Sequence, residues 1–284
     1  MSTTDAASLG LSGADHPLLG AVVAVPETGG VLGTSWLSLR AHPWLADHAV
    51  GDVVLVPGTG LAELVVRAGD EVGCGTLEEL VIEMPLVVPA QGGVRVQVAV
   101  GGPEENGTRS VAVYSAREDS GGGTGTDVWT RHAAGTLTAA TVPATGFDFT
   151  VWPPVGAERV PFDAAEFYED LADRGYVYGP AFQGLRGVWR RGEEVFAEVS
   201  LPDEQRGEAS GYGLHPALLD AALHSGFVQP AGPEVGIRVP FAWNGLRLHA
   251  AGASELRVRT VPSGPDAVSL QAADGAGGPV LSLQ

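Results

Sequence analysis

Apolar residues recur along the chain with two different spacings. Residues 94–100 alternate valine with polar or small residues, and residues 129–138 continue this period of two, which is typical of strands with one buried face. Residues 59–69 instead carry apolar side chains three and four positions apart, which predicts a helix that Thr59 caps and Gly69 ends. The first half of the chain is therefore predicted to combine one apolar helix with an antiparallel meander.

The second half of the chain repeats this order of elements. Asp163, with Glu166 three residues later, resembles a capping box, so a helix is predicted to begin there and to stop at Gly175. Residues 215–224, HPALLDAALH, predict another helix, with Pro216 placed to open it, and alternating strands precede and follow it. The simplest explanation is an internal duplication: an α+β fold of two units, each an antiparallel sheet wrapped around a central helix.

Composition sets the expected boundaries of these units. Residues 1–15 are mostly small and polar and are predicted to be loose, while the Pro-rich residues 146–161 read as a linker. The two units are therefore expected at 16–145 and 162–284. The Gly and Ser cluster at 120–125 predicts a mobile hairpin tip.

The charge balance excludes some partners. The chain has 16 basic and 34 acidic residues, a net charge of -18, and all of its basic residues are arginine. Such a field repels nucleic acid and anionic membrane surfaces, so neither is expected as a partner. The single cysteine, Cys74, cannot form an internal disulfide, and no segment resembles a leader or a membrane span. A cytoplasmic protein is expected.

One carboxyl group stands out on the predicted helix at 215–224. Asp220 and His224 are four residues apart, so both side chains lie on one helical face, near Leu219 and Leu223. Either Asp220 pairs with a polar group and is merely satisfied, or dry surroundings keep it protonated so that it serves as an acid. A metal site formed with His215 would match no common ligand spacing, so no metal is expected.

The remaining histidines and glycines favour no other chemistry. Four histidines lie in strand or turn contexts and are expected to be structural: His16, His42, His132 and His249. No Gly-x-Ser-x-Gly elbow occurs, and the glycine-rich stretches lack a P-loop lysine. Neither a serine hydrolase nor a nucleotide-binding protein is therefore indicated.

Four segments together resemble a known family. HAVGDVVLVP at 48–57, GYVYGPAF at 175–182, HPALLDAALH at 215–224 and VPFAWNGLRLHAAG at 239–252 are similar, in this order, to motifs of polyketide synthase dehydratase domains. The resemblance extends from about His16 to the C-terminus. It implies the double hotdog fold, which agrees with the duplication inferred from the pattern.

The first of these motifs departs from the family at one position. The family has glycine four residues after the histidine, where this chain has Asp52, while Gly51 comes one place early and Pro57 keeps its register. An acidic side chain there could act on His48 or could point outward without effect. Because aspartate can also adopt backbone shapes that glycine favours, we expect activity to be retained.

The resemblance implies elimination of water from a β-hydroxyacyl thioester, which makes the protein a hydro-lyase. His48 would be the base that removes the α-proton, because an ordinary imidazole is largely neutral at pH 7. Asp220 would be the acid that protonates the leaving hydroxyl, with burial raising its pKa and a neutral His224 orienting it.

Further residues of the matching motifs are candidates for substrate binding. By resemblance, Tyr178 would bind the departing hydroxyl, Tyr176 is a weaker candidate, and the Gly179 amide would lie near the substrate. The two tyrosines could equally be core residues with a polar tip.

The resemblance also implies partners. The substrate would be carried on the phosphopantetheine arm of an acyl carrier protein, so no cofactor is expected on this chain. A neighbouring ketoreductase and a homodimer are expected too. Arg186, Arg190 and Arg191 could dock the acidic carrier, although such a cluster is more often a solvated surface.

Two other functions stay open at the level of sequence. The chain could be a thioester-binding domain that Asp52 has impaired, which would leave a β-hydroxyacyl substrate unchanged. It could also be a dehydratase-like enzyme that epimerises an α-carbon, shifts a double bond or closes an ether ring. His48 alone could perform the first two of these reactions, whereas loss of water should also need Asp220.

Overall fold

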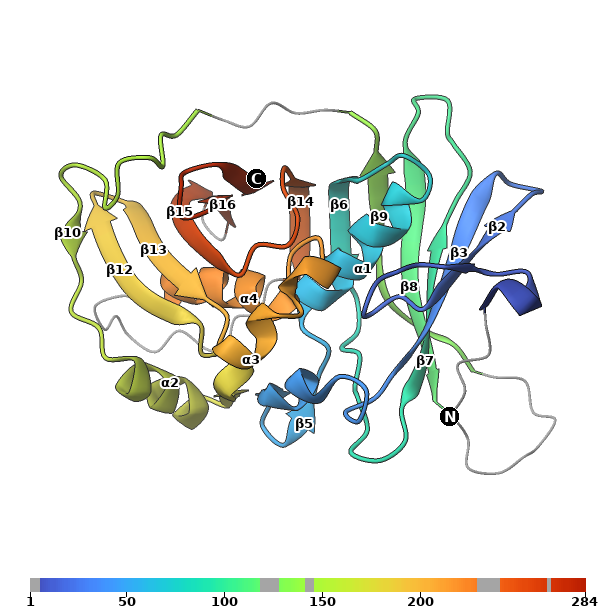
Figure 1. Cartoon of the computed structure of the whole chain (residues 1–284), viewed down its shortest axis with the longest axis horizontal. Coiled ribbons are helices and arrows are strands. Elements are labelled where there is room, and N and C mark those ends of the chain that lie inside the picture. The colour runs from blue at the N-terminus through green and yellow to red at the C-terminus, as the bar shows by residue number, and fades with distance from the viewer. Residues whose placement is uncertain (1–5, 118–127, 141–145, 229–240, 265–266) are drawn as a thin grey trace. The chain divides into compact units, whose positions relative to one another are not determined.

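The structure is a computed structural model that describes residues 6–117, 128–140, 146–228, 241–264 and 267–284 (Figure 1). The predicted hairpin tip at 120–125 lies outside these residues. The chain divides into two compact units. Unit 1 comprises Met1–Ala46, Val53–Thr141 and Phe241–Trp243, and unit 2 comprises Asp47–Asp52, Val142–Pro240 and Asn244–Gln284.

Unit 1 is an antiparallel sheet with one long helix. Its strands follow the order β1-β2-β3-β7-β8-β9-β6. Their bounds are β1 Ser12–Gly13, β2 Ala21–Val25, β3 Gly30–Leu37, β6 Thr76–Ile82, β7 Val94–Val100, β8 Arg109–Arg117 and β9 Thr130–Thr138, with the separate short strand β5 at Val53–Val54. Helix α1, Gly58–Asp70, packs against β3, β6, β7, β8 and β9 (Figure 1). Short 3-10 turns lie at Ala6–Leu9 and Pro43–Asp47.

The predicted alternation accounts for the core of unit 1. In β7 the four valines are buried and the residues between them are only partly buried, as the period of two requires. The predicted helix is confirmed, but its predicted cap is wrong: α1 begins after Pro57 without a side-chain cap, and Thr59 is buried in its first turn. The helix also runs one residue beyond Gly69.

Unit 2 has the same plan. Its sheet follows the order β14-β17-β16-β15-β13-β12-β10. The strand bounds are β10 Glu158–Arg159, β12 Leu185–Arg191, β13 Glu194–Ser200, β14 Ala242–Leu248, β15 Glu255–Gly264, β16 Ala267–Ala273 and β17 Pro279–Leu283, and β14 belongs to this unit from Asn244 onward. Helix α4, Pro216–His224, packs against β12, β13 and β15. An antiparallel sheet packed on a central helix therefore occurs twice, as the double hotdog expectation requires.

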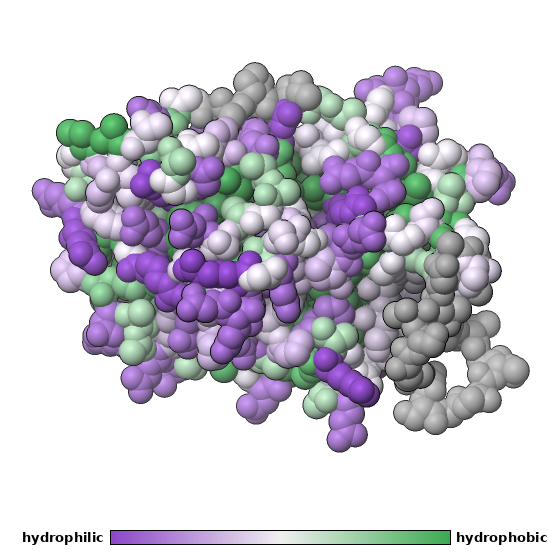
Figure 2. Space-filling view, in the orientation of Figure 1, coloured by the Kyte–Doolittle hydropathy of each residue, from purple (hydrophilic) through white to green (hydrophobic). Residues whose placement is uncertain are grey.

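The other helices of unit 2 are peripheral. Helix α2, Ala164–Asp173, begins as predicted, because the Asp163 carboxylate accepts the amide hydrogens of Ala165 and Glu166. Its acidic residues 166, 169, 170 and 173 are exposed, and Figure 2 shows hydrophilic side chains over much of the face that carries it. Helix α3 spans Asp203–Arg206, and 3-10 turns lie at Pro180–Phe182, Ala209–Gly211 and Ser225–Phe227.

A short strand places His48 in unit 2. Strand β4, His48–Val50, pairs in antiparallel register with β11, Tyr176–Tyr178, so that His48 lies opposite Tyr178. The sequence-based boundary at residue 145 had assigned His48 to the first half of the chain. The hydrogen-bonded pairing of β4 with β11 instead groups Asp47–Asp52 with the unit that carries Asp220.

Candidate functional site

His48 faces aromatic rings from the motif at 175–182. Its ring centroid lies 5.0 Å from that of Phe182 and 5.8 Å from that of Tyr178. The side chain is half-buried, so it remains accessible to a substrate. The β4–β11 pairing therefore joins the two motifs that are far apart in the sequence.

Asp220 and His224 form a hydrogen-bonded pair on α4. The distance from His224 Nε2 to Asp220 Oδ2 is 3.0 Å. His224 is 1% exposed and Asp220 is 9% exposed. Pro216 is the first residue of the helix, and His215 caps it by accepting the Ala217 amide hydrogen on Nδ1. The predicted helix and the shared face of Asp220 and His224 are both confirmed.

The acidity of Asp220 differs from the expectation. Burial raises the pKa of this carboxyl, but the hydrogen bond from His224 and the positive charges of His224 and His48 outweigh burial and lower the pKa below its ordinary value. The expected raised pKa is therefore wrong for the unliganded site. The sequence showed the leucines and His224 beside Asp220 but could not show that His48 acts on it as well.

The two tyrosines of the second motif differ in their surroundings. The Tyr178 ring lies 4.3 Å from the His224 ring, and burial, followed by the charge of Asp220, raises the Tyr178 pKa, so its hydroxyl stays protonated at neutral pH. Within the described part of the chain, the Tyr178 hydroxyl makes no hydrogen bond. Tyr176 is 5% exposed and stacks on Tyr178 with ring centroids 6.3 Å apart. Tyr178 thus lies beside the polar residues, and Tyr176 lies behind it in the core.

The Gly179 amide, which the resemblance places near the substrate, has a hydrogen-bond partner within the protein. It donates to the backbone oxygen of Asp47 at 2.8 Å, which continues the β4–β11 pairing, so this amide is already engaged. A Cβ at position 179 would clash with the Asp47 side chain, which explains the glycine. The Asp47 carboxylate also accepts the Ala181 amide hydrogen at 2.9 Å. Asp47 was missed in the sequence because a carboxylate beside a candidate histidine carries no periodic signal.

The altered motif position has a simple geometry. Gly51 adopts a left-handed conformation with φ 57° and donates its amide hydrogen to the Gly175 oxygen, while Asp52 is exposed. The turn after β4 is therefore made by the glycine that comes one place early. Pro57 is buried in unit 1, where its carbonyl accepts the first amide hydrogens of α1.

The three candidate docking arginines are engaged with the protein itself. Arg186 donates to Ser200 and to the Gln183 oxygen, and Arg190 donates to the Val228 oxygen at 2.6 Å. Arg191 forms an ion pair with Glu194 at 2.8 Å. Their donors are thus partly satisfied, and the structure adds no support for a carrier-docking role.

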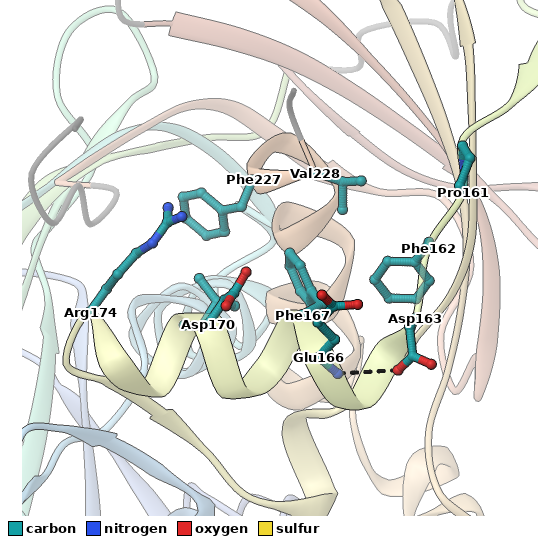
Figure 3. Close-up of a pocket in the computed structure, with 10 residues that line it drawn as sticks. Pro161, Phe162, Asp163, Glu166, Phe167, Asp170, Arg174, Phe227 and Val228 are labelled. Atoms are coloured by element: carbon teal, nitrogen blue, oxygen red, sulfur yellow. Dashed lines mark hydrogen bonds between the residues drawn. The ribbon is translucent and has the colours of Figure 1, made fainter. Parts of the chain in front are cut away.

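A pocket in unit 2 lies beside α2 and is separate from these residues (Figure 3). Aromatic rings and carboxylates line it together, namely those of Phe162, Phe167, Phe227, Asp163, Glu166 and Asp170. His48, Asp220 and His224 are absent from its lining. Phe227 borders both regions, since its ring lies 6.3 Å from the His224 ring.

The other histidines have structural partners within their own units. His16 pairs with Glu63 at 2.9 Å, His132 with Ser115 at 2.7 Å, His249 with Ser282 at 3.0 Å, and His42 with two backbone oxygens. In the described ranges, no group of three or more His, Cys, Asp or Glu side chains is placed to hold a metal ion. Nor is any helix of those ranges long and apolar enough to span a membrane.

Comparisons with known proteins match both halves of the chain. A family model described as polyketide synthase dehydratase domain matches residues 16–116, and one described as polyketide synthase dehydratase N-terminal domain matches residues 144–284. Mycoketide-CoA synthase from Mycobacterium tuberculosis is 53% identical over 99% of this chain, and the pikromycin polyketide synthase component PikAII from Streptomyces venezuelae is 52% identical over 98%. The chain spans only 6% and 7% of the lengths of these two proteins.

Solved structures of similar length give the same result. The dehydratase domain from the terminal module of the rifamycin polyketide synthase is 58% identical, with a TM-score of 0.90, over 99% of this chain and 98% of that one. The erythromycin dehydratase is 41% identical, with a TM-score of 0.87, over 99% and 98%. These findings confirm the double hotdog fold and the hydro-lyase class of enzyme. The chain belongs to the dehydratase domains of modular polyketide synthases.

Proposed function

We propose that this domain removes water from a β-hydroxyacyl thioester carried by an acyl carrier protein and leaves an α,β-unsaturated thioester. His48 takes the α-proton, the Cβ–O bond breaks as the double bond forms, and Asp220 gives its proton to the departing hydroxyl, which leaves as water. Tyr178 holds that hydroxyl, and His224 orients Asp220.

One observation carries the proposal. A candidate base and a candidate acid converge within unit 2, because His48 lies opposite Tyr178 in the strand pairing and Tyr178 lies against His224, the partner of Asp220. Elimination needs both groups near one substrate, since hydroxide is a poor leaving group. The half-burial of His48 and the free hydroxyl of Tyr178 among the described residues fit their assigned roles.

The charge of His48 connects the two proton transfers. A positive charge on His48 lowers the pKa of Asp220. His48 acquires that charge as it takes the α-proton, so Asp220 becomes a stronger acid when the hydroxyl needs its proton. The lowered pKa of Asp220 therefore suits the later stage of the reaction, and before that stage a neutral His48 removes one of the causes that lower this pKa, while burial still raises it.

The exposed Asp52 weighs against an impaired domain. An acidic residue in the family glycine position would disturb the site if it replaced a required left-handed turn or pointed at His48. Gly51 provides the left-handed turn here, and the Asp52 side chain is exposed. We therefore favour the active enzyme over the thioester-binding domain.

The biological setting follows from the family. We propose a cytoplasmic megasynthase in which a neighbouring ketoreductase makes the β-hydroxyl group, the phosphopantetheine arm of a carrier protein delivers it, and two copies of the chain associate. No separate cofactor takes part in this reaction.

The test is incubation of the protein with β-hydroxyacyl-pantetheine thioesters of both hydroxyl configurations, followed by mass spectrometry. Loss of one water from at least one of them is expected. In heavy water, uptake of one deuterium at the α-carbon without loss of water would indicate epimerisation instead. No change in either respect would contradict the proposal.

A further inference from the structure

A buried tyrosine contacts the partner of the candidate acid. Tyr168 lies on α2 and is 4% exposed, and its hydroxyl oxygen is 3.2 Å from Nδ1 of His224. The same oxygen is 3.3 Å from the Phe182 carbonyl and receives the Leu185 amide hydrogen at 3.2 Å.

The number of available hydrogens limits which of the contacts of the Tyr168 hydroxyl can be hydrogen bonds at the same time. The Tyr168 hydroxyl has one hydrogen, and the Leu185 amide already occupies one of its lone pairs. When Asp220 is a carboxylate, a neutral His224 donates from Nε2, so Nδ1 needs a donor and the Tyr168 hydroxyl supplies it. When Asp220 carries a proton on Oδ1 for the substrate, Oδ2 still accepts from Nε2, so Nδ1 needs the Tyr168 donor in that state too.

The Tyr168 hydroxyl therefore supports one tautomer of His224, with the proton on Nε2, in both states of Asp220. A buried imidazole nitrogen without a hydrogen-bond partner would destabilise the fold. The hydrogen bond at one ring nitrogen also determines which of the two nitrogens carries the proton. Burial raises the pKa of Tyr168, an effect that the Leu185 amide and Arg186 oppose and the charge of Asp220 reinforces. Tyr168 consequently remains a neutral hydroxyl throughout the proposed reaction.

We propose that Tyr168 is a positioning residue, which acts through His224 to keep the Asp220 carboxyl aimed at the substrate as it loses and regains its proton. This inference rests on the proposed function. With Oδ2 held by His224, Oδ1 is the oxygen left for the substrate hydroxyl. Tyr168 touches neither oxygen, so its effect depends on the imidazole between them.

Geometry supports this role over simple packing. Three elements meet at the hydroxyl: α2 provides it, α4 provides His224, and the segment from Phe182 to Leu185 provides the backbone groups. The same segment carries Phe182, whose ring contacts His48. A tyrosine that only filled space would not need its oxygen at the imidazole.

The test compares Tyr168→Phe with Tyr212→Phe. Tyr212 is another buried tyrosine of unit 2, and its ring lies 4.5 Å from His215 rather than from the acid. We expect Tyr168→Phe to lower kcat about tenfold with little change in KM, since His224 loses its hydrogen-bond donor. We expect Tyr212→Phe to leave kcat within about twofold of the parent.

Nitrogen NMR of the imidazoles gives a readout that does not depend on turnover. The parent is expected to show His224 with its proton on Nε2, and Tyr168→Phe is expected to change the chemical shift of the unprotonated Nδ1, which loses its hydrogen-bond donor. An unchanged His224 signal in a folded Tyr168→Phe protein would overturn the inference even if the parent dehydrates its substrate. A parent without dehydratase activity would contradict the proposed function, while the change in the Nδ1 signal would still test Tyr168.

Discussion

His48 and Tyr178 occupy directly opposed positions of the β4–β11 pair, with ring centroids 5.8 Å apart. This pairing brings a residue near the start of the chain to the same unit as Asp220. The catalytic assignment depends on it, because Tyr178 is also the neighbour of His224.

Replacing Asp220 by Asn should abolish most of the elimination. The amide has nearly the same shape but cannot give a proton to the leaving hydroxyl, so kcat is expected to fall on the order of 10²–10⁴-fold. Steady-state kinetics with a β-hydroxyacyl-pantetheine thioester measures this. If water loss survived nearly intact, the assignment of the acid would be wrong.

Gly51 and Asp52, the two residues of the turn after β4, are expected to respond differently to substitution. Gly51→Ala forces a Cβ into a left-handed conformation at φ 57°, so it should destabilise the fold by about 1 kcal/mol. Asp52→Gly should change kcat by less than about twofold, because the side chain is exposed. Denaturant unfolding and kinetics on both variants check this. A large gain of activity in Asp52→Gly would instead support the impaired-domain hypothesis.

Asp47 should hold the segment that carries Phe182. Its carboxylate accepts the Ala181 amide hydrogen, so Asp47→Ala is expected to cost about 1.5 kcal/mol of stability and to lower kcat. Asp47→Asn keeps a carbonyl oxygen as acceptor and should cost less than half as much. Equal losses in the two variants, measured by chemical denaturation, would show that the charge of Asp47 matters rather than this hydrogen bond.

Stability should fall with pH below neutrality because of His215. Burial lowers the pKa of His215 to about 4, and its Nδ1 must be unprotonated to cap α4. The unfolded chain takes up this proton below about pH 6.5, whereas the folded protein takes it up only near pH 4. The contribution of His215 to the free energy of unfolding is therefore complete above about pH 6.5. It is lost as the pH falls to about 4, by at most about 3 kcal/mol.

His215→Asn is the matched variant for this pH dependence. Asparagine can still cap the helix but does not titrate. Unfolding free energies at pH 7, 5.5 and 4.5 should decline less steeply in the variant than in the parent. Identical pH profiles would place the acid sensitivity elsewhere.

The sequence predicted structure correctly where a feature depends on residues close together in the chain. The valines of β7, the cap at Asp163 and the pair Asp220–His224 each depend on neighbours within four residues, and the structure confirms all three. The cap assigned to Thr59 failed because the helix starts two residues earlier, with Pro57 in the cap position.

Features that depend on distant partners could not be predicted. Of the causes that lower the pKa of Asp220, the hydrogen bond and charge of His224 come first, and the smaller effect of His48 comes from a distant segment. The engagement of the Gly179 amide follows from Asp47 on the paired strand. The hydrogen bond from Tyr168 to His224 likewise joins two helices. Resemblance to a family identified which residues to consider, but it did not assign a role to Asp47 or Tyr168.

The most direct measurement is mass spectrometry of a pantetheine-bound β-hydroxyacyl thioester incubated with the parent protein and with His48→Phe, each shown to be folded by circular dichroism. The parent should release one water from one hydroxyl configuration, and the variant should release none, because phenylalanine keeps the ring contacts but cannot take a proton. Equal dehydration by both proteins would contradict the central claim that His48 is the base.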